Sequence, residues 1–280
     1  MIPIQSHNDF ATMKKLFILL IIIGQCALSN AQKKSVFSPA KTWLDNKGLP
    51  INAHGGGVLF HEGRYYWYGE HKLEGKSEAQ FADGGIHCYT SKDLLNWKDK
   101  GVVLGVDFKD STNDLSYGCI LERPKVVYNQ KNRVLVAFFK LYLKGVGYEK
   151  SYVGVAVAKH PAGPFTYHHK FLGGGSTKGS GDFSMFKDDD GIVYHLAVRK
   201  PDKTFVIGRL DSDYYFPEGD YRAVEGIQVH TEAPAVIKRK GIYHLLGSGS
   251  SGWKPNIARY YTTDNILGKW TYHGPGQLVV

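Results

Sequence analysis

Residues 52–72 read NAHGGGVLFHEGRYYWYGEHK and place two strand-like runs on either side of a tight turn. The apolar run 58–60 leads into the turn at 61–63, and the aromatic run 65–68 follows it. Short apolar and aromatic runs around a glycine turn are typical of a β-hairpin. A histidine and three glycines precede this hairpin, and Glu70 ends it.

The same pattern returns three times along the chain. RPKVVYNQKNRVLVAFFK begins at Arg123, DFSMFKDDDGIVYHLAVRK at Asp182 and EAPAVIKRKGIYHLLGSG at Glu232. Each hairpin is followed by a third strand-like run and a closing phrase, so four strands are expected in each repeat. Repeats of four antiparallel strands, about 50 to 70 residues apart, are typical of β-propeller blades. A β-sandwich is the alternative, but it needs different patterns at its inner and outer edges.

The chain is therefore predicted to be an all-β protein of the β-propeller type, with about four blades. The closing phrase of the fourth repeat, GPGQLVV, coincides with the last residues of the sequence. We expect either a four-bladed propeller or a larger propeller whose last blade is missing from this sequence.

Residues 1–31 have the pattern of an upstream extension followed by a secretory signal. Residues 13–15 form a basic start, residues 16–23 an apolar core too short to span a bilayer, and small residues stand before Gln32. A buried N-terminal helix is the alternative. We expect residues 32–280 to form the propeller domain, exported to a periplasm or to the medium, with no membrane association beyond export.

Charge and cysteine content exclude several other classes of protein. The formal net charge is +9, but the basic residues are scattered and form no tract suited to nucleic acid. Cys88 and Cys119 are not spaced as zinc ligands, and both lie in strand-like runs. Buried thiols are expected, although an oxidising compartment would permit a bridge between them. The chain is expected to be a monomer.

An ionisable residue stands at the start of the first strand in every repeat. Because first strands surround the axis of a propeller and enter on one face, these side chains should converge into one site. The alternative for each is a turn cap or a pair with a lysine. Crowded carboxylates are expected to raise at least one pKa and so provide a proton donor, as cleavage of a glycosidic bond requires. The four residues are His54, Glu122, Asp182 and Glu232.

Two tryptophans are candidates for stacking on a sugar ring. Trp253 lies in SGSSGWKPN, where its neighbouring glycine and proline indicate a loop. Trp67 lies in the aromatic run of the first hairpin, where packing in the core is the alternative.

At these residues the sequence resembles glycoside hydrolase family 43, a five-bladed β-propeller family of inverting enzymes. The resemblance covers about residues 40–280. NAHGGGVLFHEGRYYWYGEHK, ERPKVVYN, FKDDDGIVYH and EAPAVIKRKGIYHLLGSGSSGW are most similar to its exo-β-1,3-galactanase subgroup. The resemblance implies a five-bladed type of propeller, of which about four blades are present here.

The resemblance also implies roles for individual residues. Glu232, in TEAPAV, matches the general acid, and Asp182, in SGDFSMF, matches the aspartate that tunes and orients that acid. His54 stands where most members carry the general-base aspartate; in the galactanase-like subgroup an amide side chain of the last blade is thought to handle the water instead. The substrate-binding residues expected on this basis are His54, Glu70, Glu122, Tyr152 and Trp253.

Three functions are compatible with these features. The leading hypothesis is an exported, exo-acting glycosidase of β-1,3-galactan or arabinogalactan-type side chains. An α-L-arabinofuranosidase of the same family and a non-catalytic glycan-binding propeller are the alternatives. The partner expected in every case is a polysaccharide or oligosaccharide. No cofactor or metal is expected, although calcium on the axis, which some family members hold, stays open.

Overall fold

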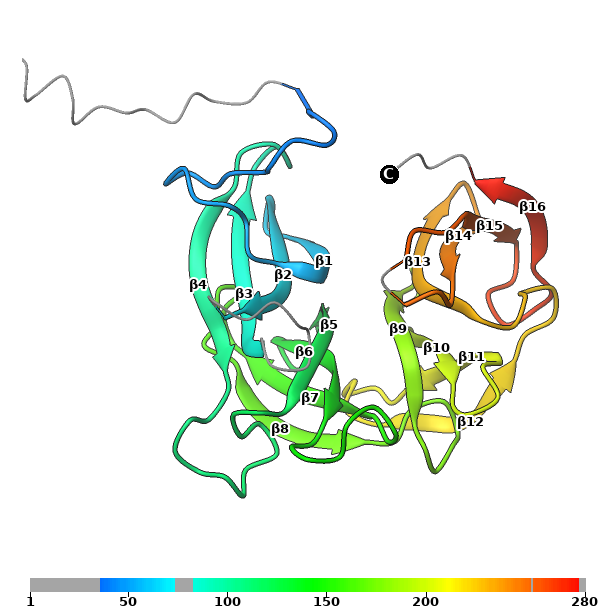
Figure 1. Ribbon diagram of the computed structural model, residues 1–280. Helices are drawn as coiled ribbons and strands as arrows, with labels where there is room; N and C mark the ends of the chain where they lie inside the picture. Colours follow the sequence, from blue (N-terminus) through cyan, green and yellow to red (C-terminus); the bar gives the residue numbers. More distant parts are fainter. Residues whose placement is uncertain (1–35, 74–82, 253, 277–280) are drawn as a thin grey trace, which may run out of the picture.

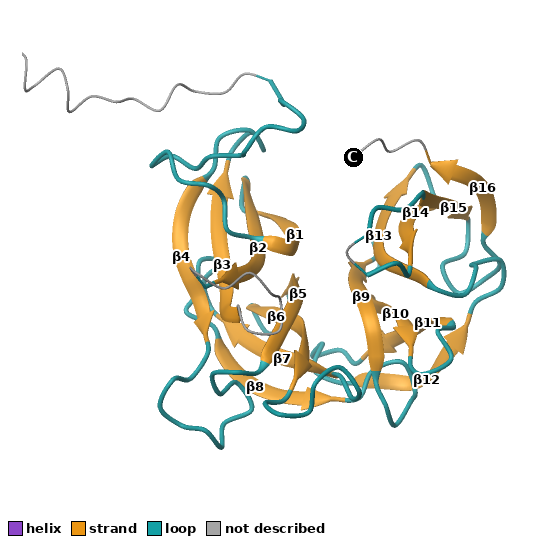
Figure 2. Ribbon diagram, viewed as in Figure 1, coloured by secondary structure: helices purple, strands orange, loops and turns teal. Residues whose placement is uncertain are grey.

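The computed structural model describes residues 36–73, 83–252 and 254–276. Its regular elements are all β-strands joined by loops, as Figure 2 shows. The strands are β1 (His54–His61), β2 (Arg64–Lys72), β3 (Asp83–Ser91), β4 (Lys98–Gly105), β5 (Ile120–Asn129), β6 (Val134–Tyr142), β7 (Tyr152–Ala158), β8 (Thr166–Phe171), β9 (Ser180–Lys187), β10 (Val193–Arg199), β11 (Phe205–Leu210), β12 (Pro217–Ala223), β13 (Thr231–Arg239), β14 (Ile242–Gly249), β15 (Ala258–Thr263) and β16 (Thr271–Gly276).

The strands form four antiparallel sheets, each made of four consecutive strands in chain order. The predicted repeats are therefore confirmed as blades. In Figure 1 the blades follow one another around a centre, with β1, β5, β9 and β13 innermost. Neighbouring inner strands contact one another, β1 with β5, β5 with β9 and β9 with β13. The arrangement is that of a β-propeller, as predicted.

Separate hydrophobic clusters hold successive blades together. Tyr68 and Phe139 belong to the cluster between the first two blades, and Phe138 and Phe183 to the next one. Trp270, nearly fully buried, belongs to the cluster between the third and fourth blades. Because side chains alternate across a strand, successive side chains of β6 point in turn toward the first blade and toward the third.

The strand β6 shows this alternation clearly and positions a charged side chain. Leu135, Ala137, Phe139 and Leu141 face the first blade, whereas Val134, Val136 and Phe138 face the third. Lys140 stands two residues after Phe138 and so lies on the same face of β6 as the second set; its exposed fraction is 7%. Its side chain is therefore directed toward the third blade, at the end of β6 opposite Glu122.

Trp43 and Ile51 pack on the face of the first blade that points away from the second blade, where Trp43 contacts Trp67 and Trp67 contacts Trp97. For Trp67 the structure thus shows the core packing given above as its alternative. Cys88 and Cys119 are both buried and free, so the expectation of buried thiols is confirmed. Within the described residues, no helix has the length and apolarity needed to cross a membrane.

Candidate active site

The start of the first blade contacts the start of the second through Glu70. The Nδ1 atom of His54 lies 2.9 Å from Oε2 of Glu70, its Cα partner on β2. The same carboxylate pairs with Lys72 at 2.8 Å, and its other oxygen accepts a hydrogen bond from the backbone N–H of Arg123 at 2.9 Å. Glu70 is 2% exposed, so these contacts satisfy a charge that has been removed from water.

The second blade contacts the third through Asp182. Its Oδ1 atom accepts from Arg123 Nε at 2.8 Å and from Lys140 Nζ at 2.9 Å. Lys140 also pairs with Glu122 at 2.8 Å, so one ammonium joins two carboxylates. Three of the four strand-start residues, His54, Glu122 and Asp182, are thus joined by one continuous network of contacts.

Asp182, one of the four strand-start residues, has a lowered carboxyl pKa and so does not supply the expected rise; the pKa of Glu70 is lowered as well. Burial acts to raise both pKa values, but His54 and Lys72 hold that of Glu70 at about 2. Lys140 and Arg123 likewise hold that of Asp182 at about 2. The prediction considered repulsion among carboxylates and overlooked the cations that enter between them.

The cations in the network are also perturbed. Burial acts to lower the pKa of Lys140, yet the Asp182 and Glu122 carboxylates hold it well above its usual value. Lys140 was not predicted as a site residue. The signal for it is a single lysine in the otherwise apolar run VLVAFF-K-LY, on the strand that pairs with Glu122. Tyr148, whose hydroxyl donates to Glu122 at 3.3 Å, was also missed and lies on a loop that carries no repeat pattern.

Glu232 is the second residue of β13 and differs from the other carboxylates in its surroundings. In the described part of the chain its ion pair is with Lys203, at 3.9 Å, on the loop between β10 and β11. A quarter of its side chain is exposed. The neighbouring Lys200 of the same loop donates to the carbonyl of Tyr148 at 2.6 Å. The loop between β10 and β11 therefore contacts Glu232 through Lys203 and, through Lys200, contacts Tyr148, which donates to Glu122.

The glycines after His54 provide space for these side chains. A Cβ on Gly55, whose φ is +59°, would lie 2.6 Å from Oε1 of Glu70. A Cβ on Gly57 would lie 2.7 Å from Cδ of Lys125. The GGG sequence is thus needed where the backbone of β1 passes close to a buried carboxylate and a lysine stem.

Of the predicted substrate-binding residues, Tyr152 lies away from the network. Tyr152 packs with the cluster between the first two blades, and Lys150 and Lys170 lie over its ring at 5.3 and 5.5 Å. It contacts these residues rather than the network, and its role in substrate binding stays a prediction. Trp253 lies outside the described residues.

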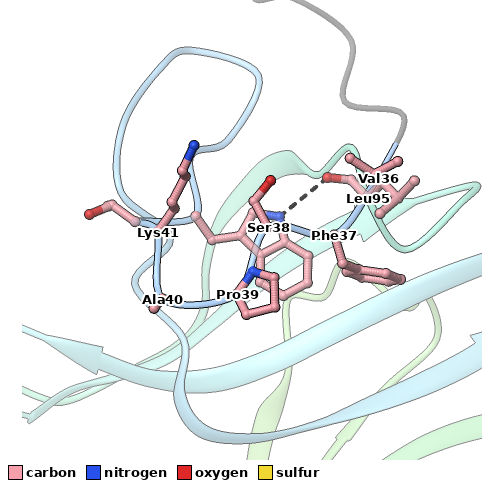
Figure 3. A pocket seen from close by; sticks show the side chains of 9 residues that line it. Val36, Phe37, Ser38, Pro39, Ala40, Lys41 and Leu95 are labelled. Atoms are coloured by element: carbon pink, nitrogen blue, oxygen red, sulfur yellow. Dashed lines mark hydrogen bonds between the residues drawn. The ribbon is translucent and has the colours of Figure 1, made fainter.

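A separate cavity of about 350 Å³ lies at residues 36–43 and Leu95, away from this network (Figure 3). It is lined mainly by apolar side chains, including Phe37 and Pro39, and a hydrogen bond from Trp43 Nε1 to the Leu95 carbonyl closes one side. Within the described residues no group of three histidine, cysteine, aspartate or glutamate side chains is arranged to hold a metal.

A β-propeller whose inner strands carry carboxylates near their starts has the architecture of a glycosidase. The chain belongs to glycosyl hydrolases family 43, whose family model matches residues 56–279. The resemblance seen in the sequence is confirmed. No curated protein matches the chain.

Several solved structures of this family are similar to the chain. A β-1,3-galactosidase with galactodeoxynojirimycin is 34% identical, with a TM-score of 0.74 over 84% of this chain and 80% of that one. The exo-β-1,3-galactanase of Phanerochaete chrysosporium with galactose is 34% identical (TM-score 0.70), with 83% and 52% covered. That of Clostridium thermocellum is 32% identical (TM-score 0.74), with 85% and 51% covered. The chain spans about half the length of these two galactanases.

Proposed function

We propose that this protein removes terminal galactose from β-1,3-linked galactan, with inversion and with Glu232 as general acid. The observation that carries the assignment is the contrast between two carboxylates. Asp182 has two cations within 2.9 Å, whereas the described ion pair of Glu232 is 3.9 Å long. A carboxyl that must carry a proton in each cycle cannot be held by close cations, so Glu232 is the better donor.

The proposed step is a single displacement. Glu232 gives its proton to the glycosidic oxygen, the bond from that oxygen to C1 breaks, and water adds to C1 from the opposite face and loses its proton to a base. Asp182 remains ionised and orients the acid, while Glu70 and Glu122 accept hydrogen bonds from sugar hydroxyls. His54, oriented by Glu70, contributes a further polar contact to the sugar.

The similar structures support galactose as the sugar. Their titles name galactose, galactodeoxynojirimycin and β-1,3-galactotriose as bound molecules. At about one-third identity, these relatives make a terminal β-1,3-linked galactose the best-supported substrate.

The test is hydrolysis of β-1,3-galactotriose by the full chain, followed by NMR of the first galactose released. We expect α-galactose, as inversion requires, and a loss of about 10²–10⁴-fold in Glu232→Gln. Glu218→Gln, on the exposed strand β12, is the matched control and should keep the wild-type rate. A dinitrophenyl galactoside, whose leaving group needs no proton, should show a much smaller loss in Glu232→Gln.

The alternatives give different outcomes in the same experiment. Turnover of an arabinofuranoside without release of galactose would establish the arabinofuranosidase. Binding of galactose without any turnover would establish the glycan-binding propeller. Unchanged hydrolysis of galactotriose by Glu232→Gln would remove the catalytic assignment.

We also propose that the protein is exported, because residues 13–31 have the pattern of a secretory signal. Mass spectrometry of the protein recovered from a periplasmic fraction should then show Gln32 as its first residue. Recovery of the uncleaved chain from the cytoplasm alone would contradict export.

A further inference from the structure

Lys125, on the inner strand β5, binds backbone oxygens of two blades with its ammonium group. Its Nζ atom donates to the carbonyls of Gly55 at 3.2 Å and Gly56 at 3.1 Å, both on β1. On its own strand it lies 3.4 Å from the carbonyl of Arg123 and 3.3 Å from that of Pro124. A set of carbonyl oxygens around one positive charge is the environment that a bound monovalent cation takes in a protein.

The local sequence is arranged so that this ammonium can reach β1. The register of β1 shifts between His54 and Gly57, which turns the Gly55 and Gly56 carbonyls away from the regular ladder. Gly57 leaves room for the lysine stem, since a Cβ there would lie 2.7 Å from Cδ of Lys125. Burial and the neighbouring charge of Arg123 lower the pKa of Lys125 to about 8, so the group still carries its charge at neutral pH.

The carbonyls that Lys125 holds belong to the residues that hold the site. Gly55 and Gly56 follow His54, whose ring contacts Glu70. Arg123 contacts Glu70 through its backbone N–H and Asp182 through its side chain. A single ammonium thus fixes the backbone on both sides of the Glu70 carboxylate.

We propose that Lys125 is a positioning residue that acts as a built-in axial cation, fixing the start of β1 against β5 and thereby the His54–Glu70 pair. This inference rests on the proposed function only for its kinetic consequence. Its structural consequence is that the group of carbonyls loses stability without a cation, and this does not depend on the substrate.

Lys125→Ala provides the test, because propylammonium replaces the deleted Cγ, Cδ, Cε and Nζ atoms. We expect the melting temperature to fall by about 5 °C or more, the size of change that a loss of charged hydrogen bonds produces in a domain of this length. Propylammonium chloride at about 50 mM should restore at least half of the loss. Tetramethylammonium, which has the same charge but no N–H donor, should not.

The kinetic arm uses β-1,3-galactotriose. Because Lys125 holds sugar-binding groups and not the proposed acid, KM should rise about tenfold in Lys125→Ala while kcat changes little, and propylammonium should lower KM again. Lys131→Ala, which removes an exposed lysine paired with Asp213, is the control and should respond to neither salt. If the wild type releases no galactose, the proposed function fails, and the melting arm still decides the role of Lys125.

The proposal is overturned if Lys125→Ala melts at the wild-type temperature, or if both ammonium salts restore it equally. Should Lys125→Ala not fold, Gly57→Ala replaces it, because its new Cβ displaces the lysine stem without removing the charge. A lower melting temperature and a raised KM would support the proposal, and wild-type values of both would contradict it.

Discussion

His195 makes the stability of the third blade depend on pH in a way that can be measured. It lies on β10 and is fully buried against Phe183, with ring centroids 4.9 Å apart. Its Nδ1 atom is 2.6 Å from the hydroxyl of Tyr221, whereas Nε2 is buried with no partner in the described part of the chain. Burial lowers the pKa of His195 from 6.5 to about 3.

The sign and size of the effect follow from proton binding. Between pH 6.5 and 3 the unfolded chain binds a proton at residue 195 that the folded chain does not, so the free energy of unfolding decreases as pH falls. Each pH unit in this window costs about 1.4 kcal/mol. The slope is smaller near pH 6.5, where the unfolded histidine is only half protonated. Over the range from pH 7.5 to 4.5 the contribution of His195 is therefore a loss of about 3 kcal/mol.

The assay is urea unfolding followed by tryptophan fluorescence at several pH values between 7.5 and 4.5. His195→Asn keeps a polar atom near the position of Nδ1 and removes Nε2, so its unfolding free energy should lose about 3 kcal/mol less than that of the wild type. The carboxylates and the remaining histidines are the same in both proteins, so the difference between their unfolding free energies isolates residue 195. His230→Asn, at an exposed position, should keep the wild-type slope. Parallel pH curves for His195→Asn and the wild type would refute the reasoning.

Three further substitutions test the network at the axis. Lys140→Met leaves two carboxylates without their shared cation and should reduce the free energy of unfolding by about 3–5 kcal/mol in urea titrations; a change below about 1 kcal/mol would contradict the network. Gly55→Ala, at φ +59° and 2.6 Å from Glu70, should cost about 1–3 kcal/mol and raise KM for galactotriose, and wild-type values would contradict the close approach. His54→Ala should raise KM and leave the acid limb of the pH–rate profile in place; a collapse of kcat with loss of that limb would instead make His54 the base.

The architecture could be predicted from the sequence because its signal is repeated. Four hairpins in the same phase specify four sheets, and an ionisable residue within the first three positions of each inner strand is found by alignment within the chain itself. His54, Glu122 and Asp182 were placed in this way and lie in one network. Their partners were harder to find, because Lys140 and Arg123 occupy no common position in the repeat.

The direction of the pKa shifts could not be predicted for the same reason. The sequence shows which carboxylates approach the axis. The sign of their pKa shifts, however, depends on whether a neighbouring strand points a lysine side chain toward them. Lys140 has the parity of Val136 and Phe138, and only the packing of the second blade on the third shows that Asp182 lies opposite. Tyr152 has the parity of Leu141 and lies on the other side of the blade.

The distribution of cations divides the carboxylates into two kinds. Glu70 and Asp182 each have a basic nitrogen within 2.9 Å, and their pKa values near 2 keep them ionised throughout the neutral range. Such groups are permanent acceptors: Glu70 can hold a sugar hydroxyl without taking up its proton, and Asp182 can orient the acid. Glu232 is of the second kind, a carboxylate without a close cation, because its contact with Lys203 is 3.9 Å long. Binding and proton donation are thereby assigned to different blades, so removing Lys140 should weaken sugar binding even where Glu232 is intact.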